Sequence, residues 1–132
     1  ILCAAVADFK PTVVAPQKIK KQNNEDLSLS LVPTADIAFA LGQRKAASQI
    51  LIGFALETDN EENNALAKLE EKNFDFIVLN SLKNANTCFQ ADTNQIKILT
   101  KSTVKSFDLK PKREVAKDIM NEVQAVIQYP DS

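Results

Sequence analysis

The chain has 132 residues, which fits one domain, and its 16 Lys and Arg residues against 17 Asp and Glu residues leave a formal net charge of −1. This balance excludes a global field that would draw the chain to nucleic acid or to a membrane, so any anion site has to be a local cluster. Histidine is absent, which excludes Ser-His-Asp, Cys-His and His-metal chemistry within the chain. No apolar run reaches the ~20 residues of a membrane span, and the context of the two cysteines favours a reduced, cytosolic protein.

Strand-like and helix-like segments alternate along the chain. The expected elements, in chain order, are an interior strand over residues 1–6, a half-buried strand over 27–31, a helix capped by Thr34 and ending near Arg44, a strand over 49–54, a helix ending near Asn73, a strand over 74–80, a hairpin over 95–107 and a helix after Pro111. This order predicts an α/β sandwich with a mainly parallel sheet, in which the 27–31 strand and the late hairpin are antiparallel additions.

The first strand is followed by a segment suited to binding an anion. A proline-broken loop after Asp8 holds Lys18, Lys20 and Lys21 around one isoleucine. If the segment is extended, Lys18 and Lys20 point to the same side and would close on a phosphate. The alternative is a solvated basic turn, which is what most charge runs are.

Two further groups of residues are candidates for a ligand site. Ligands of open α/β sheets bind at the carboxyl ends of the strands, where we expect Asp8, Phe54 and Asn80. Each also has a structural explanation, as a turn cap, a core side chain and a loop hydrogen-bonding group. Lys68 and Lys72 stand four residues apart on one helix face, a like-charge spacing that an anion between them would relieve.

The spacing of the two helix lysines also has a structural alternative. Glu71 is close enough in sequence to pair with Lys68. The chain has only two glycines, Gly42 and Gly53, so neither kind of Gly-rich phosphate loop is present. If the chain belongs to a nucleotide enzyme, its phosphate loop lies elsewhere.

Four segments in combination resemble phosphopantothenate–cysteine ligase. They are A-A-V-A-D-F at 4–9, A-P-Q-K-I-K-K at 15–21, G-F-A-L-E-T at 53–58 and K-N-F-D-F-I-V-L-N at 72–80. In bacteria this ligase is usually the C-terminal half of the bifunctional coenzyme A biosynthesis flavoprotein, of the DNA/pantothenate metabolism flavoprotein family. The resemblance extends over residues 1–128 and implies a Rossmann-like three-layer sandwich with an antiparallel dimerisation strand.

The resemblance also implies a reaction. CTP and Mg²⁺ would activate the carboxylate of 4′-phosphopantothenate as an acyl-cytidylate, and the amine of cysteine would then displace CMP. Carried onto this sequence, Lys18 would be the catalytic lysine of a flap that also holds Lys20 and Lys21. The implied nucleotide-binding residues are Asp8, Lys18, Ala35, Asp36, Ile37, Ala38, Phe54, Lys68 and Lys72. No metal ligand is assigned, and FMN is expected only if a decarboxylase half is present elsewhere.

The sequence departs from the family pattern at three places. In the usual N-P-D-I, Thr34 and Ala35 replace the asparagine and the proline, while Asp36 and Ile37 are kept. Cys88 replaces the glycine of G-F-x-x-D-x-N. The family's Gly-rich loop and catalytic asparagine precede the position of Ile1. We therefore expect a single domain over 1–132 that is the C-terminal portion of the ligase domain and is inactive alone.

Two hypotheses follow. The first is a cytoplasmic, homodimeric ligase whose partners are 4′-phosphopantothenate, cysteine and CTP, without nucleic acid or membrane. The residues alone leave CTP and ATP both open. The second is a non-catalytic nucleotide-binding or dimerisation module of the same fold, in which the 27–31 strand pairs across a two-fold axis.

Overall fold

The computed structural model describes residues 1–4, 6–20, 27–81 and 91–128. The chain divides into two compact units, the larger comprising Ile1–Cys3 and Ala38–Ser132 and the smaller comprising Ala4–Ile37. Across the described ranges, none of the helices combines the length and the apolar character needed to cross a membrane.

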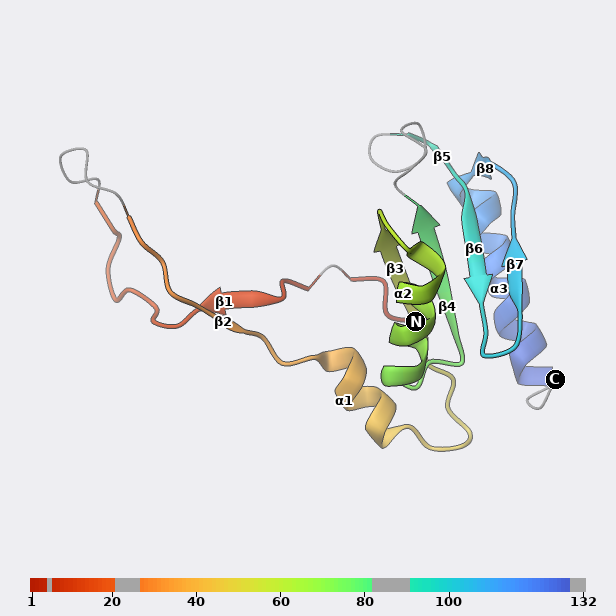
Figure 1. Ribbon diagram of the computed structural model, residues 1–132, viewed down its shortest axis with the longest axis horizontal. Helices are drawn as coiled ribbons and strands as arrows, with labels where there is room; N and C mark the ends of the chain where they lie inside the picture. Colours follow the sequence, from red (N-terminus) through yellow and green to blue (C-terminus); the bar gives the residue numbers. More distant parts are fainter. Residues whose placement is uncertain (5, 21–26, 82–90, 129–132) are drawn as a thin grey trace. The chain divides into compact units, whose positions relative to one another are not determined.

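A four-stranded mixed sheet forms the centre of the larger unit (Figure 1). Its strands lie in the order β3 (Ile52–Glu57), β4 (Phe76–Ser81), β6 (Ile96–Leu99) and β7 (Val104–Ser106). The β3–β4 pair is parallel, and Leu2 adds a parallel bridge to Gly53. The β4–β6 and β6–β7 pairs are antiparallel. The α/β class and the C-terminal hairpin are confirmed.

Helices cover both faces of this sheet (Figure 1). The helices are α1 (Ile37–Arg44), α2 (Glu61–Glu71) and α3 (Lys112–Gln128). Along β4, Ile77 and Leu79 join the core cluster that contains Leu69 of α2, while Phe76 and Val78 join the cluster that contains Ile119 of α3. Because β4 alternates between two buried clusters, the unit has three layers, as expected.

Two smaller features complete the larger unit. The strands β5 (Thr93–Asn94) and β8 (Lys110–Pro111) form a short antiparallel pair that leads into α3. Gly53 is buried in β3 under the ring of Phe74, where an added Cβ would lie 2.3 Å from Cε2 of that ring. The close approach of this ring requires glycine at position 53.

The smaller unit contains a two-stranded antiparallel ladder. Strand β1 (Phe9–Pro11) pairs with β2 (Leu31–Pro33), with Phe9 opposite Pro33. Backbone bonds extend the ladder at both ends, from Thr12 N to the Ser30 carbonyl and from Thr34 N to the Asp8 carbonyl, each at 2.9 Å.

Three expectations for the first 37 residues were wrong. Among the described residues of the segment 1–6, Leu2 forms a bridge but Ile1 and Val6 are exposed, so these residues do not form the interior strand expected there. The strand expected over 27–31 lies instead at Leu31–Pro33, because the register with β1 selects those residues. Thr34 does not cap α1, since its hydroxyl donates to the Ala7 carbonyl at 2.6 Å and the helix begins at Ile37.

Candidate functional site

A nearly buried carboxylate lies at the carboxyl end of the parallel strands. Glu57 is the last residue of β3 and stands opposite Ser81, the last residue of β4. Its side chain is 12% exposed and pairs with Lys68 of α2, with 2.6 Å between Oε1 and Nζ. Asn64 Nδ2 donates to the other oxygen of Glu57 at 3.2 Å. The pairing fits the helix geometry, because long side chains on a helix point back toward its N-terminus.

Glu57 was missed as a site residue from the sequence. It stands within the G-F-A-L-E-T segment of the resemblance, but no role was assigned to it. The pairing of Lys68 with Glu71 was wrong, since the structure pairs Lys68 with Glu57. The one signal in the sequence is the position of Glu57. It is an acidic residue at the end of an apolar strand, where the chain leads into the following helix.

Lys72 stands one helical turn after Lys68. It is the C-cap of α2, is half-buried, and its backbone N donates to the Lys68 carbonyl at 3.1 Å. Ala38 of α1 packs against the core cluster that includes Leu69 of α2. The structure therefore places Lys68, Lys72 and Ala38 on the α2 side of the sheet.

Phe54 lies on the other face of the sheet. It is in the middle of β3, not after its end, and its side chain is 42% exposed. Alternation along the strand puts Phe54 on the face of Ile52, which belongs to the α3 cluster, while Ala55 belongs to the α2 cluster. The side chain of Phe54 is thus not gathered with those of Lys68 and Lys72. Asn80 likewise lies within β4, in register with Ile96 of β6.

The other candidate residues belong to the smaller unit or to its junction with α1. Asp8 precedes β1 instead of following a strand, and its side chain is exposed. The remaining exposed members of this group are Lys18, Lys20, Ala35, Asp36 and Ile37. Lys21 and Cys88 lie outside the described residues.

A second polar region lies at the amino end of β4. A cavity of about 410 Å³ is lined there by Lys45, Asp75, Lys105 and Glu122, among others. Four of these charged residues form two ion pairs, Lys45 with Asp75 at 2.9 Å and Lys105 with Glu122 at 2.8 Å. The edge at Glu57 is the stronger candidate because it lies at the carboxyl end of the parallel strands, where ligands of open α/β sheets bind. In the described parts of the chain, no three or more His, Cys, Asp or Glu residues group to hold a metal ion.

The sequence profile of the DNA/pantothenate metabolism flavoprotein C-terminal domain matches residues 1–127. The chain belongs to this family. The match covers nearly the whole chain and confirms the resemblance carried by the four segments.

Curated relatives of this flavoprotein C-terminal domain are longer proteins. It is 41% identical over 121 residues to the coenzyme A biosynthesis bifunctional protein CoaBC of Haemophilus influenzae, covering 92% of this chain and 30% of that protein. For CoaBC of Bacillus subtilis the identity is 42% over 127 residues, covering 96% and 31%. A protein named cysteine/cysteine sulfinic acid decarboxylase, from an unknown prokaryotic organism, is 48% identical over 128 residues, covering 96% and 35%. The chain spans about a third of the length of these relatives.

Solved structures confirm the fold. The crystal structure of the C-terminal domain of CoaBC matches with a TM-score of 0.71 and 33% identity, covering 95% of this chain and 52% of that chain. A structure of a Cab2 mutant in complex with phosphopantothenate-cysteine matches with a TM-score of 0.67 at 18% identity, covering 98% and 45%, and this likeness shows the fold alone.

Proposed function

We propose that residues 1–132 are the C-terminal portion of a ligase domain that joins 4′-phosphopantothenate to cysteine at the expense of CTP, a step of coenzyme A biosynthesis. Family membership over residues 1–127 and the names of the CoaBC relatives support this proposal. The structural observation that carries it is Lys68, held by a nearly buried carboxylate at the carboxyl end of β3. Ligands of open α/β sheets bind at that end of the strands.

The geometry of the pair would allow Lys68 to exchange its contact with Glu57 for a contact with a polyphosphate. The side chain of Lys68 is 44% exposed while that of Glu57 is 12% exposed, so the lysine is the more accessible member of the pair. A triphosphate carries more charge than one carboxylate and accepts charge-assisted hydrogen bonds from lysine. With Lys72 four residues further on, two ammonium groups would neutralise charge that develops on the leaving pyrophosphate.

The reaction needs positioning more than proton transfer. In our proposal, a carboxylate oxygen of 4′-phosphopantothenate attacks the α-phosphorus of CTP, and pyrophosphate leaves. The amine of cysteine then attacks the acyl carbon, loses a proton and expels CMP. Proximity and the lysine charges lower both barriers, which agrees with a chain that has no histidine.

The remaining candidate residues keep their proposed roles. By the resemblance, Lys18 would contact the bound nucleotide from a flap with Lys20 and Lys21, and Asp8 would be a nucleotide-binding residue of the smaller unit. Phe54 keeps its nucleotide-binding role from the resemblance alone, since its side chain lies on the other face of the sheet from Lys68. The segment Ala35, Asp36, Ile37 and Ala38 would contact the base through its backbone. Mg²⁺ would arrive with the nucleotide, because this ion is commonly held by substrate phosphates with one or two carboxylates.

The test uses the full-length protein that contains this sequence. With CTP, Mg²⁺, 4′-phosphopantothenate and cysteine, we expect pyrophosphate release and formation of phosphopantothenoylcysteine, detected by mass spectrometry. ATP in place of CTP should give a lower kcat/KM, and residues 1–132 alone should give no product. Absence of CTP binding by the full-length protein in calorimetry would contradict the proposal and favour a non-catalytic module.

One observation favours self-association as a second, compatible function. The smaller unit exposes large apolar side chains that a monomer normally covers, with Leu27, Leu29 and Leu31 exposed by 65%, 61% and 54%. Val13 and Val14 are exposed by 78% and 85%. Exposed apolar patches of this kind mark interaction surfaces, and we propose that a second copy of the chain covers this one in a homodimer.

A further inference from the structure

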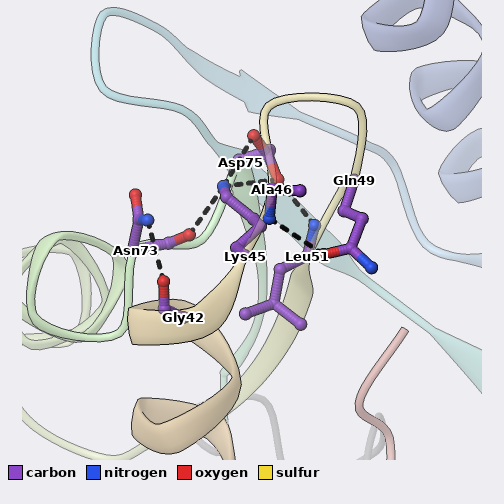
Figure 2. Close-up of polar contacts among 7 residues, drawn as sticks. All are labelled: Gly42, Lys45, Ala46, Gln49, Leu51, Asn73 and Asp75. Atoms are coloured by element: carbon purple, nitrogen blue, oxygen red, sulfur yellow. Dashed lines mark hydrogen bonds and ion pairs between the residues drawn. The ribbon is translucent and has the colours of Figure 1, made fainter.

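The end of α1 is fastened to the turn between α2 and β4 by a cluster of polar contacts (Figure 2). Lys45 Nζ donates to the Asn73 carbonyl at 2.9 Å and to both carboxylate oxygens of Asp75 at 3.0 and 2.9 Å. Asn73 Nδ2 donates to the Gly42 carbonyl at 3.1 Å. Asp75 also accepts the backbone N–H of Leu51 at 2.6 Å. We call Gly42, Lys45, Asn73 and Asp75 the α1 clamp.

The contacts of the α1 clamp fix the end of α1 against the turn that precedes β4. The side chains of Lys45 and Asp75 are 13% and 27% exposed, so their pair is stronger than one at the surface. Asn73 has a φ of 51°, a left-handed conformation that aims its side chain at α1 while its carbonyl faces Lys45. At Gly42 the helix approaches the neighbouring turn so closely that an added Cβ would lie 2.0 Å from the Lys72 carbonyl oxygen.

The clamp connects two helices that carry proposed nucleotide-binding residues. Gly42 packs directly on the backbone of Lys72, the C-cap of α2. Ala38 precedes Gly42 by four residues, so both lie on one face of α1, and Ala38 packs on the same core cluster as Leu69 of α2. The contacts of Lys45 therefore fix Ala38 on one helix relative to Lys72 on the other.

We propose that Lys45 and Asp75 are positioning residues of the nucleotide site, which act by fixing α1 against the end of α2. This inference rests on the proposed function and adds two residues that touch no substrate. It predicts that loss of the clamp weakens nucleotide binding and leaves the binding of cysteine, which contacts the site later in the reaction, unchanged.

The chain contains a matched control for this test. Lys105 donates to both carboxylate oxygens of Glu122 at 2.8 Å, and the side chain of Glu122 is 11% exposed. This pair joins β7 to α3, and it lines the same cavity as Lys45 and Asp75 without a hydrogen bond to the clamp among those of the described residues. A lysine-to-methionine change in each pair removes the same chemistry and leaves a partly buried carboxylate behind.

The experiment compares Lys45→Met and Lys105→Met in the full-length protein. Both variants should lower the melting temperature. Lys45→Met should raise KM and the calorimetric Kd for CTP by about tenfold or more, since small misplacements in a site carry penalties of this size. Its KM for cysteine should stay within about twofold, and Lys105→Met should leave KM for CTP within about twofold. Should Lys45→Met fail to fold, the same values are measured on Lys45→Met/Asp75→Asn, which leaves no uncompensated charge.

Equal effects of the two variants on KM for CTP would overturn the positioning role while the proposed function stands. A rise in KM for cysteine as large as that for CTP would overturn it too. An unsubstituted protein that neither binds CTP nor makes product would overturn the proposed function, and this inference with it.

Discussion

Lys68 of α2 and Glu57 at the end of β3 form a 2.6 Å ion pair. This pair joins the helix to the carboxyl end of the strand. The pair leaves the lysine more exposed than the glutamate, so the carboxylate keeps the ammonium in place without covering it. A ligand with higher negative charge can compete for this lysine from its exposed side, while the amide of Asn64 remains on the nearly buried carboxylate of Glu57.

This relationship gives a prediction for both members of the pair. In the full-length protein, Lys68→Met should raise KM for CTP by about tenfold, the expected cost of one charge-assisted contact to a phosphate. Glu57→Gln should leave KM for CTP unchanged or lower it, because the competing charge is gone. Lys117→Met is the control, since Lys117 pairs with Glu114 on the surface of α3. Equal KM values for Lys68→Met and the control would remove Lys68 from the site.

The buried glycine of β3 gives a prediction about stability. Gly53→Ala should destabilise the protein by about 1–3 kcal/mol, because its Cβ would lie 2.3 Å from the Phe74 ring. Phe74→Leu also destabilises, but the double variant should lose less than the sum of the two. Urea denaturation of the four proteins measures this coupling. Strictly additive losses would show that the ring does not set the requirement for glycine.

The pair of Lys105 and Glu122 predicts a second stability effect. Lys105→Met should cost about 1–3 kcal/mol of unfolding free energy, because it leaves the nearly buried Glu122 without its partner. Lys117→Met should cost less than about 0.5 kcal/mol, since both members of that pair are exposed. The comparison is made by denaturation at matched salt, and similar losses in the two variants would contradict it.

The exposed leucines of the smaller unit predict an effect on assembly. Leu29→Asp in the full-length protein should shift the sedimentation coefficient from that of a dimer to that of a monomer, because a carboxylate in an apolar interface is costly. Thr12→Asp in the same unit is not a suitable control, since its hydroxyl bonds to Ser30. Gln17→Asp, at an exposed position outside β1 and β2, serves instead and should leave the dimer intact.

The sequence predicted the three-layer unit well because its elements are long and strongly patterned. The stripe of α3 includes the buried Val115 and Ile119, and the apolar run of β4 is buried on both faces. The alternation at Leu27, Leu29 and Leu31 predicted a buried face that the described unit does not cover. Periodicity reports which side chains would suit burial, and what covers them depends on contacts outside the segment.

The candidate site was predicted in part. Helical spacing predicts Lys68 and Lys72 on one face. The partner of Lys68 is Glu57 of β3, and it could be identified only once the packing of α2 against β3 was known. The two faces of β3 follow from period two, so the separation of Phe54 from the lysines was readable. The α1 clamp could not be predicted from the sequence, because Lys45 and Asp75 are thirty residues apart and meet only in the folded unit.

Strand β7 has one further consequence, for solubility. It is the last strand of the four-stranded sheet in the described part of the chain, and all three of its residues are exposed. An open strand edge is a template for cross-β stacking between molecules, and a lysine on the edge is a common protection against it. Lys105 sits at the middle of β7 and is fixed there by Glu122, so a contact that joins strand to helix also keeps a positive charge where fibril growth would begin.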